Sequence, residues 1–129
     1  MALKVSGTTV VNSSRQVENI TRIDLNGSYI SNIVAVAALD INCTSGVYFT
    51  KTINGSSTFT FSSVPSSSKV YAFTLELTHS SGSVTWPSTV TWPGGTAPTL
   101  TTGKTHLFTF ITDDGGSRWR GTSLVDYTN

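Results

Sequence analysis

The chain has 129 residues, which suffices for one domain of ordinary size. Only 12% of the residues are charged, about half the usual share of roughly 25%, and the net charge is +1. A chain so nearly neutral creates no field that attracts nucleic acid or an anionic membrane, which excludes a DNA-binding module that depends on a basic face. Six Phe, four Tyr and three Trp residues supply large apolar side chains for a core.

Two features of the chain bear on where the protein acts. The first seven residues hold no apolar stretch of the kind a signal peptide needs, so we expect no secretory signal. The longest apolar run covers residues 33–39, far short of the roughly 20 residues that a membrane helix requires. We therefore expect no insertion into a membrane.

Residues 1–37 predict an N-terminal attachment and oligomerisation segment. Residues 4–11 favour a small hairpin around Ser6-Gly7. After this hairpin, isolated apolar residues stand in polar sequence and offer too little continuous apolar surface for a separate core. We expect the segment to lie against the β-domain, a sister copy or a larger assembly, and the apolar run 33–38 is a candidate interface strand.

Residues 38–129 predict a β-domain, because apolar side chains recur there at every second position. Asn54-Gly55 predicts a two-residue hairpin turn, and residues 113–116 predict another turn. No stretch of ten residues has helical spacing with caps. Seven or eight short strands are expected within residues 39–43, 47–53, 58–61, 69–79, 84–87, 90–93, 107–112 and 117–125. The pattern is typical of an all-β fold, an antiparallel β-sandwich of jelly-roll-like or immunoglobulin-like type with an extended N-terminal segment.

Two parts of the sequence resemble virion proteins of bacteriophages. Residues 3–20 are similar to a start found in tail-fibre proteins, the run Gly-Thr-x-Val-Ile-Asp-x-Ser-Arg-x-(Leu/Ile)-x-Asn-Ile, with Asn12 in place of the usual Asp and Val17 in place of Leu or Ile. Residues 84–98, 107–110 and 113–121, which include two Trp-Pro pairs, are similar to a C-terminal module of phage fibre and minor structural proteins. Together these parts cover roughly half of the chain.

The resemblance implies a short tail-fibre-type virion protein that forms a homotrimer. Its N-terminal segment would attach to the tail or baseplate, and its β-domain would contact host surface glycans. The residues of that segment that we assign to assembly are Val5, Val10, Val11, Arg15, Val17 and Ile20. An alternative is a capsid cement or decoration protein that clamps neighbouring capsid subunits, because the chain is small for a fibre. In either case, the expected location is the virion, and the partners are copies of the chain and other virion proteins.

The three tryptophans allow two interpretations. Trp86, Trp92 and Trp119 could form a platform on which sugar rings stack, or each could anchor the core of a small sandwich. Arg118 and Arg120 flank Trp119 and would lie on the opposite face of a strand. They could bind a carboxylate of a partner subunit or an acidic glycan, or they could be solvated charges that discourage aggregation of an edge strand.

Cys43, the one cysteine of the chain, also allows two interpretations. It alternates with Leu39 and Ile41, which indicates a small buried hydrophobic residue. Because a single cysteine can pair only outside its own chain, an interchain disulfide to a neighbouring virion protein is the alternative.

Little in the sequence indicates catalysis. His79 and His106 are accompanied by no HExxH or GxSxG motif, phosphate loop or metal-ligand spacing, and His79 is expected to be half-exposed at a strand end. Asp113 and Asp114 are adjacent, so on a strand they would point to opposite faces, whereas a glycosidase needs two carboxylates that face one sugar. We expect a structural protein without enzymatic activity, cofactor or metal ion.

Overall fold

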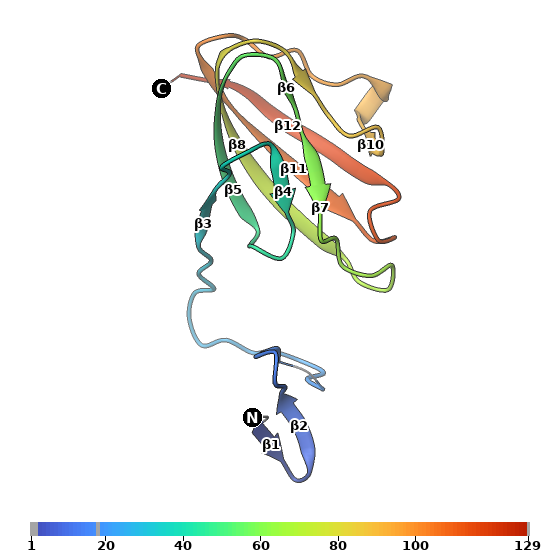
Figure 1. Ribbon diagram of the computed structural model, residues 1–129. Coiled ribbons are helices and arrows are strands. Elements are labelled where there is room, and N and C mark those ends of the chain that lie inside the picture. The colour runs from blue at the N-terminus through green and yellow to red at the C-terminus, as the bar shows by residue number, and fades with distance from the viewer. Residues whose placement is uncertain (1–2, 18, 129) are drawn as a thin grey trace. The chain divides into compact units, whose positions relative to one another are not determined.

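A computed structural model of the chain describes residues 3–17 and 19–128, and the side chains of these residues except 3–5, 9 and 10 (Figure 1). The chain forms two compact units, Met1–Ile30 and Ser31–Asn129. The boundary therefore follows Ile30, rather than residue 37 as the sequence predicted. The difference arises because strand β3 (Ile33–Ala35) pairs with the main sheet and belongs to the second unit.

The first unit begins with the predicted hairpin. Strands β1 (Leu3–Val5) and β2 (Thr8–Val11) pair in antiparallel fashion. The backbone φ angles of Ser6 and Gly7 are 49° and 81°, and two positive φ angles in a two-residue loop are the signature of a type I′ turn. From residue 19 to residue 30, the described chain forms neither helix nor strand.

The second unit is built on a six-stranded sheet in the order β10-β12-β11-β8-β5-β3. The three longest strands are β8, β11 and β12, and the pairs β8–β11 and β11–β12 are antiparallel. The pairs β3–β5, β5–β8 and β10–β12 are parallel. The bounds of the strands besides β3 are β5 (Tyr48–Asn54), β8 (Tyr71–Ser81), β10 (Val90–Thr91), β11 (Lys104–Thr112) and β12 (Trp119–Tyr127). The predicted all-β, sandwich-like class is confirmed, and the sheet is mixed where purely antiparallel pairing was expected.

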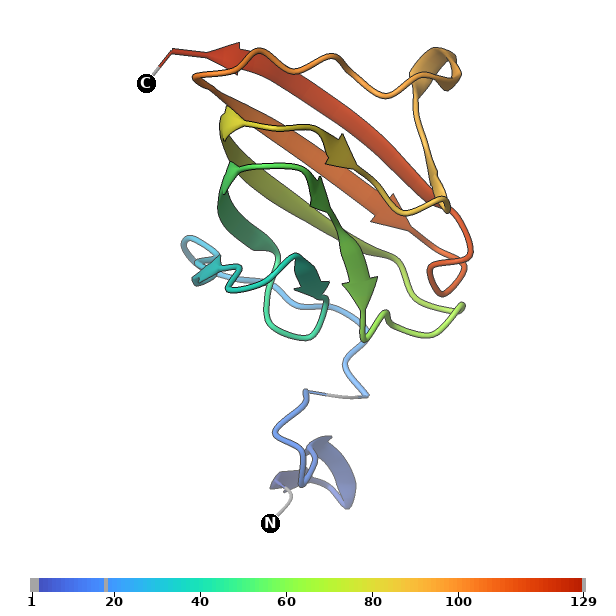
Figure 2. The ribbon, with the colours of Figure 1, turned by 45° about the horizontal axis from the view of Figure 1, so that its top comes forward.

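Short strands form a second layer over this sheet, as Figure 2 shows. Strand β4 (Asp40–Asn42) pairs in parallel with β7 (Thr60–Ser62), and β6 (Ser57–Thr58) pairs in parallel with β9 (Val84–Thr85). Only Phe59 separates β6 from β7, and its backbone N–H donates to the carbonyl oxygen of Thr85 at 2.9 Å. The second layer is therefore close to continuous across the sandwich.

The chain passes from the large sheet to the second layer three times, after β3, β5 and β8. The hairpin predicted at Asn54-Gly55 is wrong, because the chain there crosses between layers and β5 does not pair with β6. A hairpin would place both segments in one sheet. The crossing instead brings Phe49, Ile53 and Phe59 into one buried cluster, which removes the apolar side of each segment from water.

The second and third crossings touch at two glycines. A Cβ atom added to Gly82 would lie 2.1 Å from the carbonyl carbon of Gly55, a distance that no real Cβ can occupy. The φ angle of Gly82 is 90°, which also favours glycine. These two positions let successive crossings stack closely, and this stacking sets β5 parallel to β8 and β6 parallel to β9.

The core lies between the two layers and is rich in aromatic rings. The predicted alternation is confirmed in β8, because Phe73, Leu75 and Leu77 are fully buried and alternate with exposed or half-buried neighbours. The buried apolar residues are Val36, Ile41, Cys43, Phe49, Ile53, Phe59, Phe73, Leu75, Leu77, Phe108, Phe110 and Trp119. The predicted turn at residues 113–116 joins β11 to β12, with positive φ angles at both glycines.

Candidate functional site

Trp119 belongs to the core and not to a surface. Its side chain is 1% exposed, and its ring contacts those of Phe61 and Phe73 with centroid distances of 5.0 Å and 5.6 Å. A platform of three tryptophans for sugar stacking is therefore wrong, because one of its members has no free face. The core interpretation of Trp119 is the one that the structure supports.

Trp86 and Trp92 close the core where the second layer ends. The ring of Trp86 stacks on Phe59 at 5.2 Å and lies 4.7 Å from the ring of Phe108. Trp92 packs over Gly121, where an added Cβ would lie 2.9 Å from the indole. Both side chains are half-buried and pack against the core.

Arg118 is engaged by the turn that precedes β12. Its Nη2 atom lies 3.1 Å from Oδ1 of Asp113 and 3.8 Å from Oδ2 of Asp114. Oδ1 of Asp114 accepts hydrogen bonds from the backbone N–H of Arg118 and the hydroxyl of Thr112, both at 3.0 Å. The bond from the Arg118 N–H is the main reason why the pKa of Asp114 is lowered. Two carboxylates thus balance the charge of Arg118.

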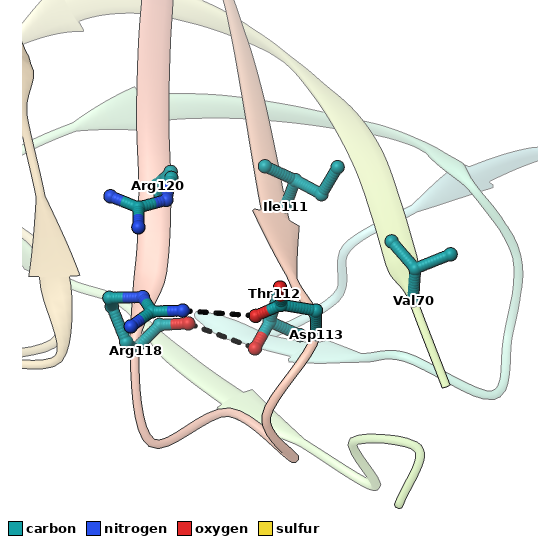
Figure 3. A pocket seen from close by; sticks show the side chains of 6 residues that line it. All are labelled: Val70, Ile111, Thr112, Asp113, Arg118 and Arg120. Carbon is teal, nitrogen blue, oxygen red and sulfur yellow. Dashed lines mark hydrogen bonds and ion pairs between the residues drawn. The ribbon is translucent and has the colours of Figure 1, made fainter. Parts of the chain in front are cut away.

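Arg120 is exposed and forms no ion pair with any described residue. It lies opposite Ile111 in the β11–β12 pair, and with Val70 and the Arg118 turn these residues line a shallow depression of about 120 Å³ (Figure 3). On its other side, Arg120 lines a second depression with the edge of Trp92. The two predicted arginines thus lie together on the surface, and Arg120 is the cation available to a carboxylate.

The two histidines are buried side by side on β8 and β11. His79 is 4% exposed, so the expectation that it is half-exposed is wrong; its Nε2 lies 2.7 Å from the carbonyl oxygen of Gly82, and its buried Nδ1 has no partner. In His106, Nδ1 accepts the backbone N–H of Asp126 at 3.1 Å, and Nε2 lies 3.3 Å from the carbonyl oxygen of Thr101. Burial lowers the pKa of His106. The ring centroids are 5.9 Å apart. These positions were not predicted, because the predicted strand 69–79 ends two residues before β8 does, and the predicted strand 107–112 begins three residues after β11 does.

Cys43 lies in the core with a free thiol that is 5% exposed. Burial, with a smaller contribution from Asp40, raises the pKa of this thiol to about 11. The buried interpretation is therefore the one that the structure supports. An interchain disulfide would require the thiol to leave the core, so the structure speaks against that alternative.

The predicted assembly residues extend into a longer exposed arm. The side chains of Val5 and Val10 lie outside the described residues, Val11 is half-buried and forms a bridge with Val17, and Arg15 is exposed. The exposed apolar side chains of the arm are Val17, Ile20, Ile23, Leu25, Tyr29 and Ile30. The last four of these were not among the predicted assembly residues, although the position of Tyr29 and Ile30 just before the apolar run 33–38 was a usable signal. We call residues 17–30 the arm from here on.

Residues 3–17 and 19–128 offer neither a metal site nor a membrane-spanning helix. No group of three or more His, Cys, Asp or Glu side chains lies close enough to hold a metal ion. Among the same residues there is no helix whose length and apolar character would let it cross a bilayer. The site features that remain are the Arg120 depressions and the arm.

The fold and these features define the class: an all-β, sandwich-like domain with an exposed apolar arm. Comparison with known proteins finds no matching family model, no similar curated protein and no similar solved structure.

Proposed function

We propose that this protein is a bacteriophage virion structural protein of the short tail-fibre type, which forms a homotrimer and attaches through its N-terminal segment. It acts by association and not by catalysis. The observation that carries the proposal is the arm, in which six large apolar side chains are exposed to solvent. The resemblance of residues 3–20 to the start of phage fibre proteins supports the same assignment.

The exposure in the arm is large for every member. Val17, Ile23 and Leu25 are 61%, 67% and 55% exposed, and Tyr29 and Ile30 are 75% and 86% exposed. Burying a large apolar side chain completely stabilises a complex by about 1.5 to 3 kcal/mol. Several such side chains together can offset the 4 to 15 kcal/mol that association costs in lost freedom. A segment with this many exposed large apolar side chains is suited to an interaction site.

The β-domain supports an outward role in the same proposal. Its core is closed by Trp86 and Trp92, and its surface is rich in Ser and Thr and poor in charge. Arg120, exposed and without a carboxylate, is the residue that we assign to contact with acidic host glycans. Three copies in one trimer would turn weak single contacts into avid binding to a repetitive surface.

The location of the protein tests this proposal. Immunogold electron microscopy, with an antibody against the purified protein, would be applied to phage particles produced by the cells that express the gene. Label at the tail, with few copies per particle, is the expected result. Dense label over the head would contradict the tail assignment and favour the capsid cement alternative, and particles without label would overturn the virion assignment altogether.

A further inference from the structure

We propose that residues 20–25 of the arm form a strand on the β3 edge of a second copy of this chain. The inference rests on the proposed homotrimer and names the contact that holds it together. Three observations carry it: the open edge at β3, the strand-like alternation of residues 20–25, and the fact that residues 20–25 form no strand in the single chain.

The backbone of β3 presents free hydrogen-bonding groups. In the parallel pair with β5, the N–H of Val36 donates to the carbonyl oxygen of Thr50 at 2.9 Å. Because alternate residues of a strand face opposite neighbours, Val34 and Val36 turn their N–H and C=O groups toward β5. Ile33 and Ala35 therefore turn theirs outward, where no described strand pairs with them.

Strands β10 and β4 carry features that oppose pairing at their edges, and β3 does not. Strand β10 has two residues and is followed closely by Pro93, while β4 carries Asp40, whose carboxylate accepts hydrogen bonds from Thr60 and Ser62. Shortness, proline and charge are the devices that prevent edge-to-edge pairing. Strand β3 is as short as β4, but Ile33 is 71% exposed and residues 33–38 are all apolar. Such an edge is suited to pairing with another strand.

Residues 20–25 of the arm carry the pattern of a strand but form none in the single chain. In an extended chain, residues two apart lie on one side. Arg22 and Asp24 form an ion pair with each other, as this geometry allows. Ile23 and Leu25 then share the opposite side, and both are exposed. Added next to β3, this segment would continue the inner face with Ile23 and Leu25 and the polar outer face with Arg22 and Asp24.

A second copy is the occupant that the structure favours. Only residues 26–32 separate this segment from β3, yet in the single chain the segment forms no strand. Each chain offers one arm and one edge, so the contact joins two different surfaces head to tail. Contacts of this kind form closed rings when the rotation between copies allows it, and a ring of three copies satisfies every arm and every edge. This mode of recognition is strand addition, in which backbone hydrogen bonds supply affinity.

Charged variants of the full-length chain test the edge. In Ile33→Lys, the edge carries a charge that opposes strand addition, and we expect the dissociation constant of self-association to rise at least about tenfold. The matched control is Val70→Lys, because Val70 is 69% exposed and lies outside the strands, and it should change association less than about twofold. If Ile33→Lys associates as well as the wild type, the inference is overturned while the homotrimer stands. A wild type that stays monomeric at every concentration overturns both.

A mixture of an edge variant and an arm variant shows whether the arm of one copy pairs with the β3 edge of another. Ile33→Lys keeps its arm, and the double variant Ile23→Asp, Leu25→Asp keeps its edge. Each alone should remain monomeric, but the mixture should form a one-to-one dimer, because one arm and one intact edge remain. A mixture that stays monomeric would contradict exchange between copies. A double variant Arg22→Gln, Asp24→Asn changes the opposite side of the same segment and should associate like the wild type.

Amide hydrogen exchange supplies a direct structural measurement. The N–H groups of Ile33 and Ala35 should exchange slowly in the oligomer and rapidly in the dilute monomer. The N–H of Val34 faces β5 and should be protected in both, which makes it the internal control. Rapid exchange at Ile33 and Ala35 in the oligomer would overturn the inference.

Discussion

Arg120 is the residue through which the proposed glycan contact acts. Gln at this position keeps hydrogen-bonding capacity but removes the charge. Hydrogen bonds to charged groups contribute about 1.5 to 3 kcal/mol, and this site is exposed, so we expect Arg120→Gln to weaken binding to carboxylated glycans about tenfold. Binding to neutral glycans should not change. A glycan array, followed by titration of the strongest acidic binder, measures both effects.

The control for this variant is Arg22→Gln. It removes the same charge from an exposed arginine that already has Asp24 as its partner. Equal losses of binding in the two variants would mean that the overall charge, and not the Arg120 depressions, attracts the glycan.

His106 is expected to make the protein less stable in mild acid. Burial lowers its pKa below 6.5 in the folded state, so the unfolded chain takes up the proton first as the pH falls. The stabilisation is present above pH 6.5 and is lost as the pH falls through the lowered pKa. The nearby groups are His79, whose ring is 5.9 Å away, and Asp126, whose carboxylate is 3.8 Å from Nδ1. Asp114 also has a lowered pKa, but its contribution is lost only near pH 3.8 and below.

Thermal unfolding between pH 7.5 and pH 5.5 measures this effect. We expect the melting temperature to fall over this interval, and to fall less in His106→Gln, which has no imidazole to protonate. Parallel curves for the two proteins would show that His106 is not the group responsible.

Cys43 should be unreactive in the folded protein. Its thiol is buried and its pKa is raised to about 11, so very little thiolate is present at pH 8. We expect a thiol reagent to modify the folded protein about a hundredfold more slowly than the protein in denaturant. Reducing and non-reducing gels should both show a single monomer band. A dimer band that disappears on reduction would restore the interchain disulfide as an explanation.

For single residues, the sequence predicted which side chains share one face of a strand better than it predicted which face is buried. The alternation of Arg118, Trp119 and Arg120 predicted that the ring and the guanidinium groups lie on opposite faces, and the structure agrees. It did not predict which face is the core, because that depends on which segments cover β12. The pairing of Arg118 with Asp113 likewise depends on the shape of the turn between β11 and β12, which spacing alone does not specify.

The stacked crossings are the element on which the β-domain depends most closely. We expect Gly82→Ala to destabilise the fold by about 3 kcal/mol or more, because the added Cβ collides with the backbone of Gly55. Gly103→Ala is the matched control: its φ angle is 81°, but no atom lies within 4 Å of the added Cβ. Conformational strain alone should cost it about 1 kcal/mol. Denaturant unfolding compares the two, and equal losses would mean that the crossings are not tightly stacked.

The strands themselves were predicted well and their partners were not. Alternation located β5, β8 and β11 to within a few residues, since each has one face in the core. The dipeptide Asn54-Gly55 predicted a hairpin, but the same turn can carry a chain across to a facing layer. Choosing between the two requires knowing that Phe59 is buried in the core and stacks on Trp86, which is distant in the sequence. Parallel pairing is a property of the assembled crossings, which no local pattern shows.

For the whole molecule, we expect the β-domain to fold without residues 1–30. The buried apolar residues of the described core all lie within residues 36–119, inside the unit Ser31–Asn129. Removal of residues 1–30 should therefore leave a folded domain. We expect this shortened protein to be monomeric and its melting temperature to be independent of concentration. A shortened protein that still trimerises with unchanged heat stability would contradict the role of the arm.

The mass of the full-length protein in solution tests the central claim most directly, namely that copies of this chain complete one another. Sedimentation equilibrium over a range of concentrations measures it without labels. We predict three times the mass of the chain at high concentration, with dissociation on dilution. A mass equal to that of one chain at every concentration would contradict the account.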